Sequence, residues 1–394
     1  MSAESAGAAN GGSAGTAAAQ AAKSVVEHDM TDMATRLGPE LNAMAGSRVL
    51  ITGGAGFLGH SFVQLFAAWN RERPDEAMEL VVADNYARGL PDWLAALRGE
   101  RGLTLLRHDV TEPLPTETGS FAYVIHAASI ASPTFYRKYP LATMDANVQG
   151  LRLLLDRAVA QAEAGEPLRG FLFFSTSEIY GDPPPEMIPT PETYRGNVSC
   201  TGPRACYDES KRYGETLAVT FAQHYGVPVR TVRPFNNYGP GLSIDDGRVL
   251  PDFARNVLTG RDIVMHSDGT PTRTFCYVSD AVVGYVLALH RGRDGEAYNI
   301  GVREPEISMR ELADKVVALA AAEFGYEGQV VHQVSSERDY LVDNPNRRCP
   351  NIDKAEFELG YQPQVDLDEG LRRTLTWYRG TWSPGSSASR EVRA

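Results

Sequence analysis

The stretch Arg48–Gly59, RVLITGGAGFLG, decides the fold of this chain of 394 residues. Its first five residues predict a short buried β-strand, and the run SFVQLFAAWN that follows it predicts an amphipathic helix. Gly53, Gly56 and Gly59 lie between the two at the spacing of a dinucleotide-binding turn. In such a turn the glycines let the backbone approach a pyrophosphate at the N-terminus of a helix.

Strand-like runs continue along the chain from this turn. They are expected at residues 48–52, 78–84, 103–109, 122–128, 170–176 and 227–234. Helical patterns separate most of them, at residues 92–98, 141–162 and 208–225. Strands that alternate with helices form right-handed βαβ units, so we predict an α/β fold of the Rossmann type with a doubly wound parallel sheet.

The pattern changes after residue 238. A loop rich in glycine, proline and aspartate leads to short strands and to helices expected at 249–258, 280–289, 308–324 and 367–378. We predict a smaller C-terminal substrate-binding lobe, interleaved with strands that return to the sheet, and a cleft between the lobes. The predicted boundaries are 45–238 with 272–302 for the dinucleotide-binding domain, and 239–271 with 303–380 for the substrate lobe.

Both ends of the chain, residues 1–44 and 381–394, are predicted to be largely disordered. The first run, MSAESAGAANGGSAGTAAAQAA, offers almost no large apolar side chains to offset the entropy lost on ordering. It also lacks the basic and apolar regions of a secretory signal, so we expect a cytoplasmic protein. No apolar run approaches the about 18 residues that a membrane-spanning helix needs.

The charge balance excludes some classes of partner. Lys and Arg number 38 and Asp and Glu 50, which gives a net charge of −12. Nucleic acids and anionic membranes attract basic surfaces, so we expect neither as a partner. No His, Asp or Glu cluster has metal-ligand spacing, and we expect no metal. Reduced thiols are expected at Cys200, Cys206, Cys276 and Cys349.

Asp84 ends the second predicted strand and is the carboxylate expected to bind the adenine-ribose hydroxyls. A carboxylate repels a 2′-phosphate and therefore favours NAD, although the nearby Arg88 leaves NADP open. Asp84 lies farther from Gly53 than the about 20 residues that are usual, and the polar insert WNRERPDE accounts for the excess. Further candidate cofactor contacts are Phe57, Leu58, Asn85, Asp109, Val110, Ala127 and Ala128.

Tyr207 and Lys211 have the i, i+4 spacing of residues on one face of a helix. A cation beside a phenol, helped by an oxidised nicotinamide, lowers its pKa from about 10 and lets it act as a base near neutral pH. Thr176, at the end of the fifth predicted strand, provides a hydroxyl that can bind the same substrate oxygen. We therefore predict Tyr207 as the base, with Lys211 and Thr176 beside it.

Three stretches, GGAGFLG at 53–59, TSEIYG at 176–181 and YDESK at 207–211, together resemble the extended short-chain dehydrogenase/reductase superfamily of nucleotide-sugar epimerases, dehydratases and decarboxylases. The resemblance is closest to the UDP-glucuronate decarboxylases, also called UDP-xylose synthases, and covers about residues 47–378. Its most specific stretches are residues 196–212, 233–249, 272–280 and 347–363.

The resemblance implies roles for individual residues. It implies bound NAD, and it places Thr176 and Tyr207 at the sugar 4-hydroxyl. Lys211 is implied to tune Tyr207 and to contact the nicotinamide ribose. The resemblance places Glu178 near C5 and Arg348 near the sugar carboxylate or as a proton donor; a structural ion pair of Arg348 with Asp343 or Asp353 is the alternative. The implied contacts to the nucleotide-sugar substrate are Tyr136, Glu178, Arg204, Asn236, Arg248 and Arg273.

The implied reaction is decarboxylation of UDP-glucuronate through a 4-keto intermediate, giving UDP-xylose or the 4-keto pentose. The alternatives are 4,6-dehydration, C4 epimerisation, or a protein that binds NAD or a nucleotide sugar without catalysis. Ser177 stands where dTDP-glucose 4,6-dehydratases typically carry an aspartate, and Ile130, Pro234 and Asn237 depart from the decarboxylase pattern. The resemblance also implies a homodimer that uses the helices near 141–162 and 207–225.

Overall fold

The structure is a computed structural model that describes residues 7–333, 342 and 344–384. Within these residues a seven-stranded parallel sheet has the order β11-β6-β5-β4-β1-β2-β3. Its strands are β1 (Arg48–Thr52), β2 (Glu79–Asp84), β3 (Leu103–Arg107), β4 (Tyr123–His126), β5 (Gly170–Phe174), β6 (Val229–Pro234) and β11 (Ala297–Ile300). The order reverses between β1 and β4, where α/β sheets bind ligands. The predicted doubly wound parallel sheet is confirmed.

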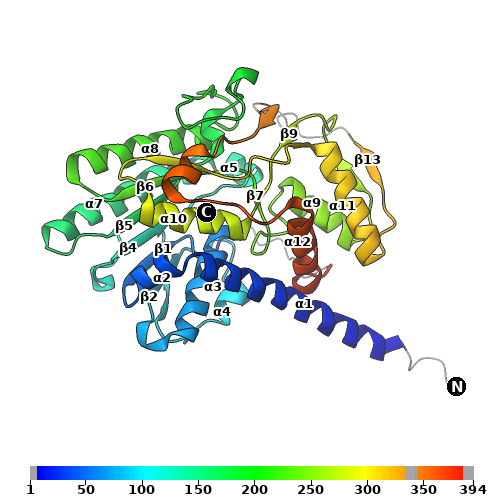
Figure 1. Cartoon of the computed structure of the whole chain (residues 1–394), viewed down its shortest axis with the longest axis horizontal. Coiled ribbons are helices and arrows are strands. Elements are labelled where there is room, and N and C mark those ends of the chain that lie inside the picture. Colours follow the sequence, from blue (N-terminus) through cyan, green and yellow to red (C-terminus); the bar gives the residue numbers. More distant parts are fainter. Residues whose placement is uncertain (1–6, 334–341, 343, 385–394) are drawn as a thin grey trace.

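Helices cover both faces of this sheet (Figure 1). One face carries α3 (Phe57–Glu72) and α10 (Val278–Arg291), and the other carries α7 (Leu151–Glu163) and α8 (Ala205–Tyr225). Leu151, Leu154 and Leu155 of α7 belong to the buried core on the second face. These leucines therefore pack inside the subunit. The short helices α4 (Asp92–Ala95) and α5 (Pro133–Lys138) line the loops at the carboxyl ends of the strands.

The helix predicted over 141–162 is interrupted. It consists of α6 (Pro140–Asp145), a π-helical turn over Ala146–Gly150, and α7. The turn positions Asn147, whose side chain contacts Ser129 Oγ at 2.7 Å and donates to Ser210 Oγ at 2.9 Å. A π turn shifts side chains relative to a regular helix, and such turns are frequent at functional sites.

The second lobe has its own apolar core. It is built from the helices α9 (Val249–Leu258), α11 (Met309–Phe324) and α12 (Leu367–Thr381), and from pairs of short strands. These strands are β7 (Asn237–Tyr238) with β10 (Cys276–Tyr277), β8 (Ile263–Met265) with β13 (Val330–His332), and β12 (Ile307–Ser308) and β14 (Arg347–Arg348) on either side of β9 (Thr272–Arg273). Between β10 and β12 the chain returns to the first lobe through α10 and β11.

The N-terminal region differs from the predicted disorder. Helix α1 (Gly7–Arg36) and helix α2 (Gly38–Met44) occupy it, and Ala22, Met30 and Met33 are buried. Helix α1 packs against α12 so closely that a Cβ on Gly380 would lie 2.2 Å from the Ala18 carbonyl oxygen. The prediction for residues 1–44 is therefore wrong in the described part. Of the predicted C-terminal tail, Thr381 ends α12 and residues 385–394 lie outside the described residues.

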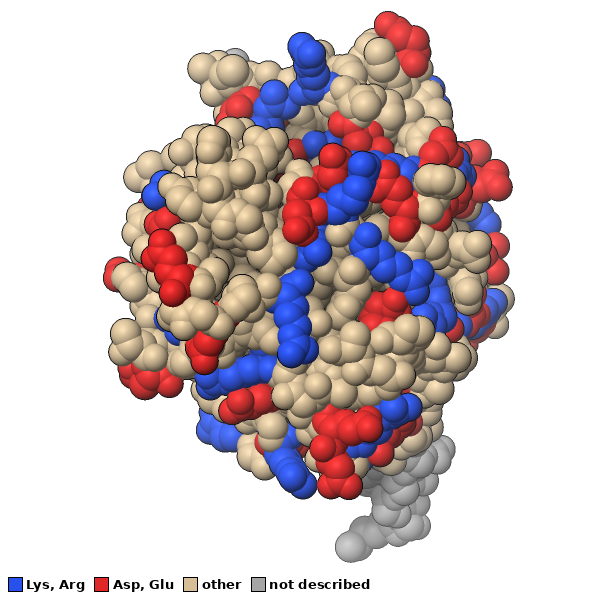
Figure 2. All heavy atoms as spheres, turned by 60° about the vertical axis from the view of Figure 1, so that its left-hand side comes forward, with Lys and Arg blue, Asp and Glu red and all other residues tan. Residues whose placement is uncertain are grey.

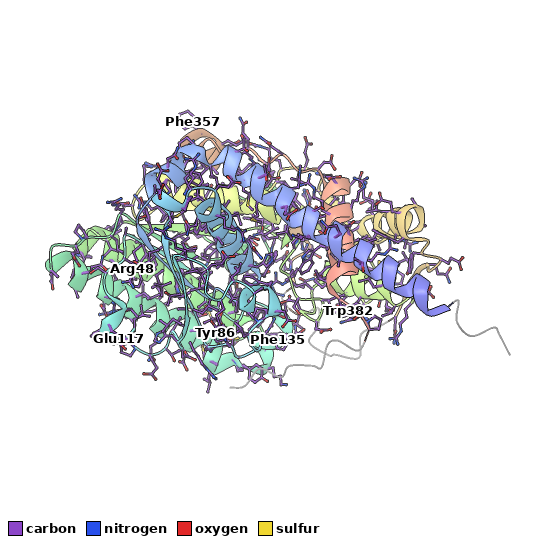
Figure 3. All side chains as sticks on the ribbon, turned by 90° about the horizontal axis from the view of Figure 1, so that it is seen from below. Arg48, Tyr86, Glu117, Phe135, Phe357 and Trp382 are labelled. Atoms are coloured by element: carbon purple, nitrogen blue, oxygen red, sulfur yellow. The ribbon has the colours of Figure 1, made fainter. Side chains whose placement is uncertain are left out.

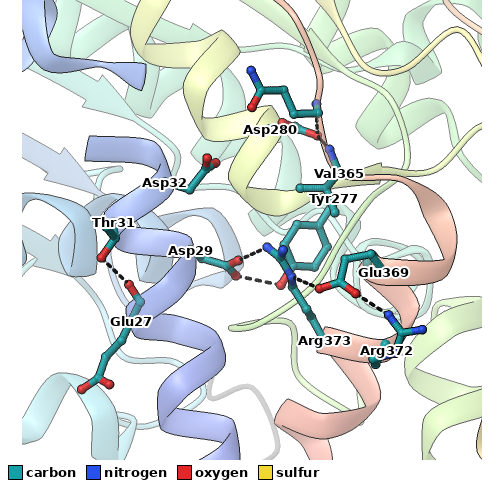
Figure 4. A network of polar contacts seen from close by, with 12 residues as sticks. Glu27, Asp29, Thr31, Asp32, Tyr277, Asp280, Val365, Glu369, Arg372 and Arg373 are labelled. Atoms are coloured by element: carbon teal, nitrogen blue, oxygen red, sulfur yellow. Dashed lines mark hydrogen bonds and ion pairs between the residues drawn. The ribbon is translucent and has the colours of Figure 1, made fainter. Parts of the chain in front are cut away.

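Buried ionic contacts fix α1 to the rest of the molecule (Figure 4). Asp29, 1% exposed, accepts hydrogen bonds from Tyr277 Oη at 2.7 Å and from Arg373 at 2.8 Å. Arg36 donates to the buried Asp280 at 2.7 Å. Burial raises the pKa of Asp29 to about 6, against the opposing effect of Tyr277 and Arg373. Helix α1 thus joins α12 of the second lobe to α10 of the first.

The four cysteines are free in the described structure. Among the described helices, none combines the length and the apolar character needed to cross a membrane. Nowhere in the described part of the chain do side chains gather in a group suited to hold a metal ion. Acidic and basic side chains alternate on the face seen in Figure 2, where basic residues form an interrupted line with acidic neighbours.

Candidate active site

A cleft of about 1560 Å³ lies at the carboxyl ends of the central strands, between the two lobes. All the residues that we predicted for the cofactor and the substrate line this cleft. Residues far apart in the sequence thus meet in this cleft. The ends of β1, β2, β4 and β5 form one side of it. The loop 239–248, together with β9 and β14, forms the other side.

The glycine turn has the geometry that a dinucleotide requires. Gly53 has φ +71°, and a Cβ on it would lie 2.6 Å from the backbone of Ala128. Gly56 precedes the first residue of α3, and a Cβ on Gly59 would lie 2.5 Å from the Gly53 carbonyl oxygen. Side chains at these positions would separate α3 from the turn and fill the cradle at the helix N-terminus. The residues present therefore fit a bound NAD.

Asp84 is held at the end of β2 by two backbone N–H groups, from Ala55 at 3.1 Å and Tyr86 at 2.8 Å. Burial raises its pKa, and these hydrogen bonds oppose the rise. Asn85 donates to Asp109 at 3.0 Å, which joins the ends of β2 and β3 at the expected ribose side of the cleft. Phe57, Leu58, Val110 and Ala127 line the same side.

Tyr207 and Lys211 lie on the buried face of α8. The Lys211 ammonium donates to the Phe174 carbonyl at 2.7 Å and lies 5.9 Å from the centre of the Tyr207 ring. Burial lowers the pKa of Lys211 to about 7. Burial raises the pKa of Tyr207 to about 12, and a hydrogen bond with Thr176 opposes the rise. The expected lowering of the Tyr207 pKa is therefore absent in this structure, because burial outweighs the neighbouring groups.

Tyr136 of α5 stacks on Tyr207, with ring centres 5.0 Å apart and an angle of 7° between the planes. Its hydroxyl is buried and has no hydrogen-bond partner among the described residues. The Thr176 hydroxyl accepts a hydrogen bond from the Glu178 backbone N–H at 3.2 Å. A hydroxyl, a phenol and an ammonium thus converge on the same part of the cleft.

Glu178 lies at the centre of an arginine cluster, which we define as Glu178, Arg204, Arg273 and Arg348. Arg348 binds both carboxylate oxygens of Glu178, with Nη2 at 2.9 Å from Oε2, and Arg204 donates to Oε2. Burial alone raises the pKa of Glu178, but the charges of Arg204 and Arg348 outweigh it and hold the pKa well below its usual range. Glu178 is therefore an anion near neutral pH.

Of the two alternative ion pairs of Arg348, the one with Asp353 does not form in the described structure. Asp353 pairs with Arg303 instead, at 2.5 Å, and Asp343 lies outside the described residues. Arg273 donates to the backbone carbonyls of Thr272 at 2.7 Å and Asn346 at 3.2 Å. Burial and the neighbouring Arg348 lower the pKa of Arg273 to about 9. Arg273 thus orders the strand that carries Arg348.

The remaining predicted substrate residues border the second lobe. Asn236 has φ 41° and donates to the Thr274 carbonyl at 2.9 Å. Arg248 precedes α9 and forms an ion pair with Asp246 at 2.7 Å. Arg88, predicted beside the cofactor, reaches across the cleft toward the same Asp246, at 3.7 Å.

Asp208 is a buried carboxylate beside the arginine cluster, and the sequence pattern did not single it out. Its carboxylate lies 4.0 Å from Arg204 Nε, and it is 4% exposed. Burial and the Glu178 charge raise its pKa to about 8, against the attraction of Arg204. Its i, i+4 spacing from Arg204 is the sequence signal that pairs the two residues.

Residues 49–301 match the profile of the NAD dependent epimerase/dehydratase family. The chain is 41% identical to UDP-glucuronic acid decarboxylase 5 of Arabidopsis thaliana, over 82% of this chain and 87% of that protein. It is 36% identical to UDP-glucuronic acid decarboxylase 1 of Xenopus tropicalis, over 84% of this chain and 72% of that protein.

Among solved structures, DesIV, a dTDP-glucose 4,6-dehydratase from Streptomyces venezuelae with NAD and TYD bound, is similar. The TM-score is 0.72 and the identity 30%, over 86% of this chain and 99% of that one. The sheet order, the glycine turn and the Tyr207–Lys211 pair agree with these likenesses. The chain belongs to the NAD-dependent epimerase/dehydratase family.

Proposed function

We propose that the protein decarboxylates a nucleotide-linked uronic acid, UDP-glucuronate, and uses NAD as a catalyst that is regenerated in each turnover. The observation that carries the proposal is the arginine cluster beside Tyr207 and Thr176. Its three buried guanidinium groups outnumber its one carboxylate, Glu178, and the excess positive charge suits the carboxylate of a substrate. The likeness to proteins named UDP-glucuronic acid decarboxylase supports the same substrate.

The chain's own groups act first at the sugar 4-hydroxyl. Tyr207 takes the proton of this hydroxyl, and Thr176 binds the same oxygen. When bound, the oxidised nicotinamide supplies positive charge beside Tyr207, accepts the hydride from C4 and later returns it. Lys211 donates to the Phe174 carbonyl, which holds its ammonium near the Tyr207 ring on the buried face of α8. The product of this step is a 4-keto sugar with a carboxylate on C5.

Such a β-keto acid loses CO₂ when the C4 oxygen can take up negative charge. The C5–carboxylate bond breaks, its electron pair moves into an enolate, and Thr176 and Tyr207 stabilise the oxyanion. A proton from solvent then adds to C5. When hydride returns to C4, Tyr207 gives its proton back to the C4 oxygen, which completes UDP-xylose. Arg348 and Arg204 orient the substrate carboxylate before it leaves, and Glu178, which contacts both arginines, offsets part of their charge throughout.

Mass spectrometry of the products from a panel of nucleotide sugars tests this proposal. Purified protein with NAD⁺ is expected to convert UDP-glucuronate with a mass loss equal to CO₂ and to leave UDP-glucose and dTDP-glucose unchanged. The experiment also shows whether the 4-keto pentose is released. Intact UDP-glucuronate after prolonged incubation, or loss of water from a hexose, would exclude the decarboxylase assignment.

One observation favours 4,6-dehydration as the second candidate, namely the structural likeness to the dehydratase DesIV. Dehydration needs a general acid to expel the 6-hydroxyl as water, and serine is a poor proton donor for that step. Ser177 occupies the position next to Thr176, and it is 3% exposed. We therefore rank decarboxylation first.

A homodimer through α6 and α8 is part of the proposal. Leu141 of α6 and Tyr213 and Tyr225 of α8 are large apolar side chains that are 70%, 51% and 58% exposed. Light scattering of the purified chain is expected to give twice the monomer mass of 42.9 kDa. Tyr213→Glu together with Leu141→Glu should shift this mass toward the monomer, while Phe357→Glu, at an exposed residue on another surface (Figure 3), should not.

A further inference from the structure

Three segments meet across the mouth of the cleft. Arg88 comes from the loop after β2, Phe135 comes from α5, and Asp246 comes from the loop before α9. The Arg88 guanidinium carbon lies 4.1 Å from the centre of the Phe135 ring, and its Nη1 lies 3.7 Å from Asp246 Oδ2. All three residues line the cleft, and Figure 3 shows Phe135 and Tyr86 at the same edge of the molecule.

The two loops opposite Arg88 also contact each other. Ser132 Oγ donates to the Asp246 backbone carbonyl at 2.6 Å. Gly247 has φ +80°, and a Cβ on it would lie 2.6 Å from Thr134 Oγ1. The backbone of the second lobe therefore lies directly against the loop that precedes α5. Asp246, 4% exposed, is fixed by these contacts, whereas the Arg88 side chain is 41% exposed at the surface.

The position of Arg88 relates this contact to the cofactor. Arg88 follows Asp84 and Asn85 by a few residues on the loop that borders the expected ribose side. Asp246 also pairs with Arg248 on the substrate side at 2.7 Å. We propose that Arg88, Phe135 and Asp246 form a clasp that joins the two lobes over the dinucleotide and sets the rate at which the cofactor leaves.

The proposed reaction gives this clasp a purpose. The hydride taken from C4 is returned to the same sugar, so a reduced cofactor that escapes between the two transfers ends the turnover. A clasp of modest strength, made of one cation–π contact and one ion pair, slows escape without preventing exchange between turnovers. Only this benefit to turnover rests on the proposed function. The effect of the clasp on NADH release can be measured without any sugar.

The test measures release of NADH by loss of its fluorescence when excess NAD⁺ is added to the full chain. Arg88→Met is expected to speed release by about threefold to twentyfold, because it removes both contacts of the clasp. Phe135→Leu should speed release less, and the two changes combined should give less than the product of their separate effects. Arg310→Met, at an exposed ion pair with Asp314, is the matched control and should leave release unchanged.

Asp246→Asn distinguishes the clasp from a direct repulsion between the Asp246 carboxylate and the cofactor. Removing a negative charge beside an anionic cofactor slows its release if Asp246 only repels NADH, whereas opening the clasp speeds it. We expect release to be twofold or more faster, with a melting temperature like that of the wild type. Slower or unchanged release in Asp246→Asn, or release within twofold of wild type in Arg88→Met, would overturn the inference. Slow NADH release from a wild-type chain that does not decarboxylate UDP-glucuronate would refute the proposed function and not the clasp.

Discussion

The Tyr207–Lys211 pair and the arginine cluster lie in one cleft, but their protonation is controlled by different forces. Burial dominates at the pair, where it raises the pKa of Tyr207 to about 12 and lowers that of Lys211 to about 7. Paired charge dominates at the cluster, where two arginines keep Glu178 ionised despite its burial. The pKa shifts of Tyr207 and Lys211 favour their neutral forms, whereas the pKa shift of Glu178 favours its charged form. The pair is thus suited to move protons, and the cluster to hold and release an anion.

The largest expected effect follows from removing the phenol. Tyr207→Phe should lower the rate of UDP-glucuronate turnover by at least about 1000-fold, because general acid–base groups contribute on that order. NADH binding should persist, since the glycine turn and Asp84 are untouched. Tyr213→Phe, at an exposed residue of the same helix, is the control. Turnover in Tyr207→Phe near the wild-type rate would remove Tyr207 from the mechanism.

The arginine cluster should respond in a different way to loss of its carboxylate. Glu178→Gln should slow turnover by about 100-fold and also lower the unfolding free energy by about 3 kcal/mol, because two buried arginines lose their counter-charge. Kinetics and urea unfolding measure the two effects. Glu306→Gln is the matched control, since Glu306 binds Arg347 at 2.7 Å at a more exposed position. A variant with unchanged rate and lowered stability would make Glu178 purely structural.

Lys211 should show its burial as a pH dependence of stability. Its pKa is about 7 in the folded chain and 10.5 by reference, so the unfolded state binds more protons between these values. The unfolding free energy should therefore rise with pH between 7 and 9.5, by up to about 1.4 kcal/mol per pH unit. Urea unfolding of wild type and Lys211→Met at several pH values isolates this contribution. Parallel curves for the two proteins would show that Lys211 is not shifted.

Asp29, which lies outside the cleft, should give a pH dependence of stability opposite in sign to that of Lys211. Its pKa of about 6, against 3.8 by reference, means that the folded state binds more protons between pH 4 and 6. Its contribution to stability should therefore fall as pH rises through this range. The stability of wild type relative to Asp29→Asn should decline from pH 4 to 6 and then level off. If the stability difference between the two proteins did not change from pH 4 to 6, the pKa of Asp29 would not be raised. If Asp29→Asn instead changed the catalytic rate, the role of Asp29 would not be structural alone.

Local patterns predicted several elements in both lobes. The bounds of β1 and α9 agree with the expected 48–52 and 249–258, because a short apolar strand and an amphipathic helix have clear periods. The glycine turn was equally readable, since positive φ and close approach require glycine at Gly53. The interruption of the helix over 141–162 could not be predicted from the sequence. A π turn leaves no periodic signal, and its cause lies in contacts of Asn147 with distant elements.

The arginine cluster shows how far the site could be predicted from the sequence. Glu178, Arg204 and Arg348 were each predicted, through resemblance, to face the substrate. That they bind one another depends on η4 (Ser177–Tyr180), the start of α8 and β14, which converge only in three dimensions. The error at the N-terminus has a similar origin. Alanine-rich sequence has high helix propensity, and the contacts that stabilise α1 come from α10 and α12, far along the chain.

Helix α1 also limits how the protein can be shortened. A chain that began at residue 49, where the family match starts, would lack both Asp29 and Arg36. The buried Asp280 would then lose Arg36, and Arg373 would keep only Glu369 as an ion-pair partner among the described residues. The surface of α12 around Gly380, which α1 covers, would be exposed to water. Such a chain should aggregate during expression even though it contains every residue of the cleft. We therefore expect helix α1 to be needed for solubility, and a purification tag is better placed ahead of this helix than in its stead.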